Sequence, residues 1–148
     1  MRIRLFKLLD SDAVLRLWER CQLLVPWNDP RVDIEKKMAF QADLFFVGEV
    51  DKIIVASAMA GYEGHRGWIN YLAVEPSLQR SGLGREMMNH CEQVLENLGC
   101  QKINLQIRSG NLAVLRFYEN LGFKRDDCIA MGKRLQRESL ANKRDNNQ

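Results

Sequence analysis

A glycine-containing loop between an apolar strand and a periodic helix carries the residues whose types and spacing best suit a chemical role. It runs from Val74 to Arg85, with glycines at 82 and 84 and an arginine at 80. The first N–H groups of a helix lack partners within it, and the helix dipole adds about half a positive charge, so a helix beginning near Gly82 can bind an anion. Glycine also lets a phosphate approach the backbone amides. We therefore predict a diphosphate site here, with simple turn formation as the alternative.

Two well-known phosphate-binding motifs do not fit this loop. A P-loop requires G-x-x-x-x-G-K-[ST], and a dinucleotide fingerprint requires G-x-G-x-x-G. After Gly84 the chain continues with Arg85 and Glu86, which matches neither. The residues follow Q/R-x-x-G-x-G/A instead, with Gln79, Gly82 and Gly84 at the three specified positions. This pattern resembles the coenzyme A pyrophosphate loop of the GNAT superfamily of N-acetyltransferases.

Residues 111–123 extend the resemblance. The later helix of that superfamily usually reads N-x-x-A-x-x-x-Y-x-x-x-G-F, and Asn111 and Tyr118 fill its two functional positions. The alanine stands at 113 rather than 114, a departure that leaves both polar residues in register. The chain is also similar to small YpeA-type members of the superfamily, and the resemblance covers nearly all of residues 1–135. The stretches that carry this second similarity are residues 17–21, 26–30 and 64–67.

The resemblance implies an α/β fold of the GNAT type, with a mixed, mostly antiparallel β-sheet, helices on both faces and a splayed central pair of parallel strands. Hydrophobic periodicity predicts the same order of elements, β-α-α-β-β-β-α-β-α-β-β. The predicted strands cover about 3–7, 44–50, 53–62, 68–74, 102–107, a region from 123 and 128–135, and the helices about 10–21, 30–40, 82–98 and 111–122. We expect one domain over residues 1–138 and a polar tail over 139–148.

The resemblance also implies that acetyl-CoA is the co-substrate, with its pantetheine arm between residues 68–74 and 102–107. Main-chain groups of three residues would hold the arm and polarise the thioester carbonyl. Those three residues are Leu72, Ala73 and Val74. The other predicted cofactor-binding residues are Gln79, Arg80, Ser81, Gly82, Leu83, Gly84, Arg85, Asn111 and Tyr118. Asn111 could instead cap its helix, and the sequence does not separate the two roles.

In the implied reaction a neutral primary amine attacks the acetyl carbonyl directly in a ternary complex, so positioning supplies much of the rate. Tyr118 is the candidate acid for the departing thiolate. A phenol with a pKa of about 10 facing a thiol of about 8.5 makes full proton transfer uphill by about 2 kcal/mol, so a strong hydrogen bond to the thiolate is the alternative. Glu63 and His65 could accept the amine's proton through water. Their alternative roles are a solvated turn carboxylate and a histidine that caps backbone groups.

The acceptor would enter from the side of Trp27, Asn28 and Asp29, which fall where the family's acceptor-side loop lies. Asp29 could serve only as the N-cap of the helix that follows. The acceptor would be a small-molecule or peptide amine. A non-catalytic acyl-CoA-binding sensor or regulatory module is the alternative function, because it would keep the same loop.

Composition narrows the classes of protein to which the chain could belong. The 148-residue chain is 46% hydrophobic and 28% charged, as in soluble globular domains. It has no apolar run of about 20 residues and no signal-peptide core, so we expect a cytoplasmic protein without a membrane partner. Its cysteines and two histidines lack metal-ligand spacing, so no metal is expected. A net charge of +3 is too small to indicate nucleic-acid binding, although a late basic cluster keeps that alternative open. The sequence also leaves open whether the protein forms a homodimer.

Overall fold

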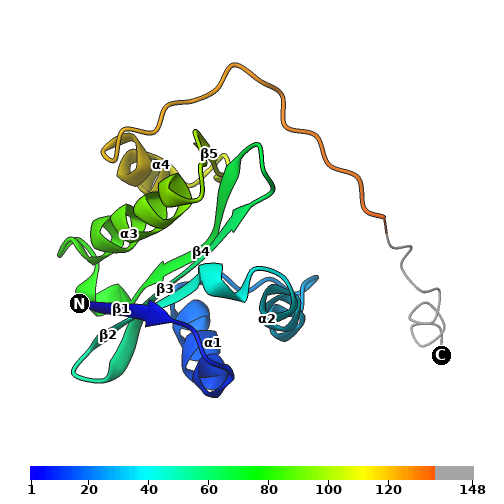
Figure 1. Cartoon of the computed structure of the whole chain (residues 1–148). Coiled ribbons are helices and arrows are strands. Elements are labelled where there is room, and N and C mark those ends of the chain that lie inside the picture. Colours follow the sequence, from blue (N-terminus) through cyan, green and yellow to red (C-terminus); the bar gives the residue numbers. More distant parts are fainter. Residues whose placement is uncertain (136–148) are drawn as a thin grey trace, which may run out of the picture. The chain divides into compact units, whose positions relative to one another are not determined.

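The computed structural model describes residues 1–135, and the chain divides into two compact units, Met1–Leu112 and Ala113–Gln148. The strands are β1 (Arg2–Leu5), β2 (Phe45–Val50), β3 (Ile53–Tyr62), β4 (Gly67–Val74) and β5 (Ile103–Asn104) (Figure 1). The helices are α1 (Ser11–Arg20), α2 (Pro30–Ala39), α3 (Leu83–Asn97) and α4 (Leu112–Glu119). The predicted domain over 1–138 spans both units and stays a prediction, and the predicted tail over 139–148 lies outside the described residues.

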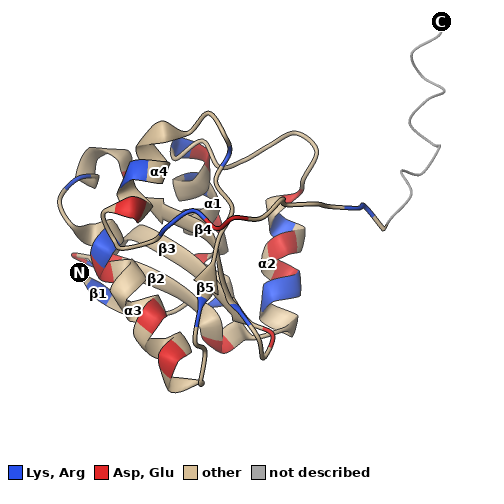
Figure 2. Ribbon diagram, turned by 90° about the horizontal axis from the view of Figure 1, so that it is seen from above, with Lys and Arg blue, Asp and Glu red and all other residues tan. Residues whose placement is uncertain are grey.

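The first unit is built on a five-stranded mixed sheet in the order β1-β2-β3-β4-β5. The first four strands pair antiparallel, and β4 pairs with β5 in parallel. Helices α1 and α2 lie on one side of the sheet and α3 on the other, and charged residues of both signs lie along α2 (Figures 1 and 2). The predicted fold class, a mixed sheet with helices on both faces and a parallel strand pair, is confirmed.

Alternation along β2 produces the two faces of this sheet, because successive strand side chains point in opposite directions. The ring of Phe45 stacks on Phe6 at 4.1 Å and lies 6.3 Å from Trp18 of α1, between centroids. The next residue, Phe46, meets His90 of α3 edge-on at 4.7 Å. Each face therefore has its own hydrophobic core, and the sheet holds α1 and α3 apart at fixed positions.

Helix α3 follows the loop singled out in the sequence, and most of its apolar stripe is buried, although Leu98 at its end is 50% exposed. Its fully buried side chains are Met87, Met88, Cys91 and Leu95. Burial raises the pKa of the Cys91 thiol to about 12, so this residue is a small apolar core group rather than a nucleophile. Gly99 follows the helix in a left-handed conformation, with φ of 88°, as expected of a C′ glycine.

The hairpin between β2 and β3 confirms the predicted two-residue turn and supplies its type. Asp51 and Lys52 both have positive φ, at 50° and 64°. Positive φ at both central residues is the geometry of a type I′ turn, whose twist matches that of the flanking strands. Neither position is a glycine, so the turn type could not be predicted from the sequence.

Three strand predictions in the later part of the chain are wrong. Strand β5 covers only Ile103–Asn104, not residues 102–107, and the predicted strands beyond residue 123 form no ladder among residues 1–135. Ile129 and Met131 are 90% and 93% exposed. A strand is stable only where it pairs and buries a face, and this stretch interrupts its few apolar residues with glycine, aspartate and basic residues.

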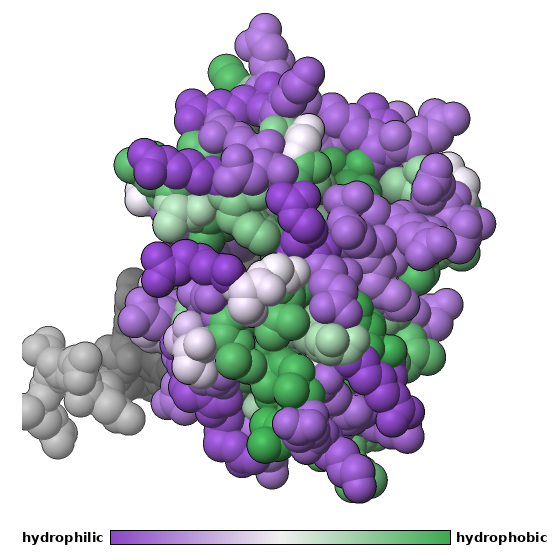
Figure 3. All heavy atoms as spheres, turned by 90° about the vertical axis from the view of Figure 1, so that its left-hand side faces the viewer, coloured by the Kyte–Doolittle hydropathy of each residue, from purple (hydrophilic) through white to green (hydrophobic). Residues whose placement is uncertain are grey.

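Strand β1 forms the opposite edge of the sheet, and among residues 1–135 it pairs with β2 alone. Large apolar side chains near this edge are exposed: Leu5, Leu8, Leu9 and Ile53. Figure 3 shows apolar residues gathered among hydrophilic ones on the face that looks left in Figure 1, where the N-terminus lies. Arg4 makes ion pairs with both Asp10 and Glu49, and these charges hold the edge strand to the neighbouring turn.

Candidate active site

The parallel strands β4 and β5 separate after two residue pairs. Gly67 pairs with Ile103 and Trp68 with Asn104, and the amide of Gly67 donates to the carbonyl of Lys102 at 2.9 Å. Strand β4 then continues to Val74, and within residues 1–135 no strand pairs with this edge beyond Trp68. An extended ligand could therefore lie along the edge and use its main-chain groups, as an added strand does.

A bulge interrupts β4 just before the predicted thioester-binding residues. The register with β3 shifts between Ser57 and Met59, and Tyr71 has a left-handed φ of 51°. Such a backbone costs an aromatic residue about 1–2 kcal/mol. The buried Ser57 hydroxyl stabilises it, because it donates to the Tyr71 carbonyl at 3.1 Å and accepts from the Trp18 indole at 2.8 Å. Leu72, Ala73 and Val74 follow this bulge directly.

One side chain from the end of α1 and one from the loop bond the last carbonyl of β4. The Val74 carbonyl accepts from the Cys21 thiol at 3.2 Å and from the Gln79 amide at 3.0 Å. Burial raises the pKa of Cys21, so its thiol remains a proton donor at neutral pH. The side-chain amide of Gln79, a predicted cofactor-binding residue, thus stabilises the loop. The Ser81 hydroxyl similarly donates back to the carbonyl of Leu78.

The N-terminus of α3 has the geometry of an anion site. Gly82 is the N-cap residue, with φ of 92°, and a Cβ placed on it would meet nothing within 4 Å. The first α3 bond runs from the Glu86 amide to the Gly82 carbonyl at 3.0 Å, so the earlier amides have no partner within the helix. Glycine offers no capping side chain, and an external anion can take that place. Arg80 and Arg85 are exposed around this end.

The predicted acceptor loop meets the β4 bulge through one residue. The Asn28 amide donates to the Tyr71 hydroxyl at 3.1 Å and to Asp33 Oδ2 at 2.7 Å. Trp27 is 62% exposed, and the Arg108 guanidinium carbon lies 5.7 Å from its ring centroid. Asp29 accepts from the Arg31 amide at 2.9 Å, so it is the N-cap of α2.

Sequence reasoning missed Tyr71 and Asp33. The Tyr71 hydroxyl donates to Asp33 Oδ2 at 2.6 Å, and its ring stacks on Trp18 at 4.0 Å. Burial and the neighbouring carboxylate raise the pKa of Tyr71, which keeps it a hydrogen-bond donor. In the sequence, a tyrosine inside an apolar strand has the pattern of core, and an aspartate in a helix has that of surface. No sequence signal pointed to their contact.

Glu63 and His65 lie in the turn between β3 and β4. The Glu63 carboxylate accepts from the amides of His65, at 3.2 Å, and Arg66, so it closes the turn. The His65 ring is exposed beside the Arg66 guanidinium. At about 3.3 Å per residue, this turn is roughly 20 Å along β4 from Leu72. The structure thus does not bring these residues to the bulge, and their role as proton acceptors stays a prediction.

Tyr118 belongs to the second unit, on α4. Its buried ring meets Phe117 and Phe123 edge-on at centroid distances of 5.0 and 5.4 Å. After the helix Gly122 adopts φ of 94°, and the Phe123 amide bonds the Tyr118 carbonyl at 3.0 Å. Asn111 ends the loop just before α4 and is exposed. The relation of Tyr118 to the α3 loop stays a prediction.

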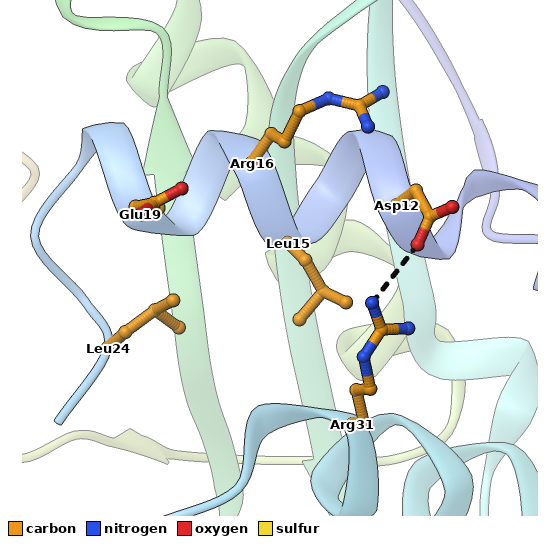
Figure 4. A pocket seen from close by; sticks show the side chains of 6 residues that line it. All are labelled: Asp12, Leu15, Arg16, Glu19, Leu24 and Arg31. Atoms are coloured by element: carbon orange, nitrogen blue, oxygen red, sulfur yellow. Dashed lines mark hydrogen bonds and ion pairs between the residues drawn. The ribbon is translucent and has the colours of Figure 1, made fainter. Parts of the chain in front are cut away.

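A depression of about 310 Å³ lies between α1 and the start of α2 (Figure 4). It is lined by Asp12, Leu15, Arg16, Glu19, Leu24 and Arg31. Arg31 pairs with Asp12 at 3.3 Å across it. None of the predicted site residues lines this depression. Within residues 1–135 no group of His, Cys, Asp or Glu is placed to hold a metal ion, and no helix there is long and apolar enough to cross a bilayer.

Comparison with known proteins identifies the fold that carries this site. The sequence profile of the acetyltransferase (GNAT) family matches residues 12–123, which include the β4 bulge, the α3 loop and Tyr118. The chain belongs to the GNAT family. The GNAT family uses acetyl-CoA.

Individual relatives agree with the GNAT assignment. An acetyltransferase from Pectobacterium atrosepticum is 48% identical over 135 residues, which cover 91% of this chain and 96% of that protein. The ribosomal-protein-S18-alanine N-acetyltransferase of Escherichia coli has a TM-score of 0.68 at 25% identity, covering 84% and 78% of the two chains. AAC(6')-Iy, solved with the bisubstrate analogue CoA-S-monomethyl-acetylneamine, has a TM-score of 0.71 at 18% identity, covering 90% and 97%. This GNAT protein is therefore an acyltransferase.

Proposed function

We propose that this protein transfers an acetyl group from acetyl-CoA to a primary amine by direct attack in a ternary complex. The observation that carries the proposal is the opening of β4 away from β5 within the same unit as the uncapped N-terminus of α3. The first feature suits an extended arm and the second suits a pyrophosphate, and coenzyme A has both.

In this proposal the loop residues bind the nucleotide end of the co-substrate. The α3 amides beginning at Leu83 and Gly84 would donate to the pyrophosphate, and Arg80, Ser81 and Arg85 would surround it. Gly82 would keep the approach open, and Gln79 would preserve the loop through the Val74 carbonyl. The residue types and the open space at Gly82 fit a diphosphate, because they offer donors and no competing carboxylate cap.

The edge of β4 would hold the arm and the acyl group. Main-chain groups of Leu72, Ala73 and Val74 would bind the pantetheine amides and polarise the thioester carbonyl, since the bulge at Tyr71 redirects the strand there. Tyr118 would donate a hydrogen bond or a proton to the departing thiolate, and Asn111 would cap α4 or bind the coenzyme. Glu63 and His65 remain proposed routes for the amine's proton.

The acceptor would be a small-molecule or peptide amine entering beside Trp27 and Asn28, with Asp29 fixing the start of α2. The relatives described above, one named for alanine N-acetylation and one bound to an acetylneamine analogue, support an amine acceptor. We place the protein in the cytoplasm, where thiols stay reduced, because the cysteines of its described part form no disulfide. A homodimer also belongs to this proposal.

The discriminating experiment is a coenzyme A release assay over peptides, diamines and amino sugars, with acetyl-CoA binding measured in parallel. The proposal predicts thiol release that depends on both the amine and acetyl-CoA. Tight acetyl-CoA binding without release across the panel would favour a sensor or regulatory module. A protein that binds neither acetyl-CoA nor coenzyme A would refute both functions.

A further inference from the structure

The hydrogen-bonded group at the β4 bulge contains a carboxylate that the fold leaves unneutralised. Asp33 Oδ2 accepts from the Tyr71 hydroxyl and the Asn28 amide. Among the hydrogen bonds and ion pairs of residues 1–135, none reaches its other oxygen, Oδ1, and none of the ion pairs includes Asp33. A half-buried carboxylate with a free oxygen and no cationic partner attracts a positive charge.

The position of this carboxylate is held by a residue of β4 as well as by its own helix, α2. Tyr71, which bonds it, has a strained φ of 51°, and its ring stacks on Trp18 at 4.0 Å. Strain that the surrounding structure holds in place is typical of binding sites. The next residue along the strand is Leu72, where the acetyl group would lie. The carboxylate lies at the tip of the Tyr71 side chain, on the side of the sheet that α1 and α2 cover, and Tyr71 immediately precedes the proposed reaction centre.

The neighbouring Trp27 ring offers a second feature that suits a cation. It is exposed, it adjoins Asn28 in the chain, and it already carries the Arg108 guanidinium over its face at 5.7 Å. An exposed indole can bind a cation over its face, and here an acceptor's ammonium would take the place of the Arg108 guanidinium. An acceptor entering here would meet an aromatic face and then a carboxylate.

We propose that Asp33, held by Tyr71 and Asn28, is the specificity-determining residue for acceptors that carry a second positive charge. The ammonium group that does not react binds Asp33 Oδ1, which leaves the reacting amine toward Leu72. The acceptor class is then a diamine, or a peptide or amino sugar with a second cationic group near the reacting nitrogen. This inference rests on the proposed N-acetyltransferase function.

The test compares two acceptors of similar length, 1,5-diaminopentane and 5-amino-1-pentanol, which differ in the second charge. Wild type is expected to have the lower KM for the diamine. Asp33→Asn keeps a group that can accept from Tyr71, and it should raise the diamine KM about 10-fold or more, as expected for a lost charge-assisted bond. Its KM for the amino alcohol and its kcat should change less than about threefold.

Asp12→Asn is the matched control, because it removes a carboxylate from the α1 and α2 surface that does not contact Tyr71. It should leave the diamine preference intact. Tyr71→Phe keeps the ring stacked on Trp18 and removes the hydroxyl, so it should give an intermediate loss of preference. Thermal melts of each variant establish that the fold persists.

Equal diamine preference in wild type and Asp33→Asn would overturn the proposal, as would an equal loss in Asp12→Asn. If wild type acetylates neither of these amines nor any other amine of the panel described above, the proposed function fails, and the subsite is then tested by calorimetric titration of 1,5-diaminopentane into the coenzyme A-loaded protein. Binding that Asp33→Asn weakens about 10-fold would support the subsite alone. Binding that is absent or unaffected would overturn it.

Discussion

The two ends of α3 offer a matched pair of glycines that separates strain from ligand binding. Gly82, before the helix, and Gly99, after it, have φ of 92° and 88°. A Cβ added at either position would meet nothing within 4 Å. Alanine at each site therefore introduces the same backbone strain without a steric clash. Only Gly82 lies at the proposed pyrophosphate site, so only one substitution should affect the ligand.

The magnitudes follow from this geometry. A left-handed backbone costs alanine about 1–2 kcal/mol relative to glycine, which corresponds to a melting temperature lower by roughly 2–8 °C in a chain of this size. Gly82→Ala and Gly99→Ala should both show this loss. In addition, the Gly82→Ala methyl group crowds amides that would bond a charged phosphate. Losing one such bond costs about 1.5–3 kcal/mol, or roughly 10–100-fold in acetyl-CoA affinity.

Thermal denaturation of the free proteins and calorimetric titration of acetyl-CoA test the pair. We expect similar melting temperatures for the two variants and weaker acetyl-CoA binding in Gly82→Ala alone. The reasoning is refuted if Gly82→Ala binds acetyl-CoA as tightly as Gly99→Ala. It is also refuted if the two lose affinity equally, because the effect would then arise from helix stability.

Three further predictions concern other elements. Tyr118→Phe should lower kcat at least about 10-fold with little change in the KM for acetyl-CoA; unchanged turnover would remove Tyr118 from the mechanism. Asp10→Asn should cost about 1–2 kcal/mol at pH 7, measured by urea denaturation, because hydrogen bonds from Arg4 lower the pKa of Asp10 below its ordinary 3.8. Gly67→Ala places a Cβ 2.8 Å from Cys100 Sγ and should destabilise the protein by about 1–3 kcal/mol.

The pH dependence of the Asp10 effect has a fixed sign. A carboxyl whose pKa is lowered by folding contributes stability above its unfolded pKa, and this contribution disappears as the pH falls through the folded pKa. The difference between wild type and Asp10→Asn should therefore be full at pH 5–7 and shrink below about pH 3.8. A difference that grows on acidification would contradict the role of the Arg4 bonds.

Local sequence patterns predicted the elements whose stability is local. Helix α3 was predicted because its apolar residues recur at helical spacing and Gly99 can adopt a positive φ. The α2 start was predicted because Asp29 and Pro30 form an N-cap and first-turn pair. In both cases the residues that decide the structure lie within a few positions of one another.

Features that depend on distant residues could not be predicted in the same way. The length of β5 depends on where β4 leaves it, and apolar alternation alone overestimated it. The bond between Tyr71 and Asp33 joins residues 38 positions apart, and it requires a strained backbone that no propensity favours in tyrosine. Gln79 matches a binding motif, but its amide bond to Val74 is visible only in the structure.

The central claim is that the α3 N-terminus holds the pyrophosphate of a coenzyme A thioester while β4 holds its arm. The most direct measurement compares calorimetric titrations of acetyl-CoA and S-acetylpantetheine, which shares the arm and thioester but lacks the nucleotide and its pyrophosphate. The account predicts acetyl-CoA binding at least about 100-fold tighter, with most of that difference lost in Gly82→Ala. Equal affinities for the two compounds, or no acetyl-CoA binding at millimolar concentration, would contradict it.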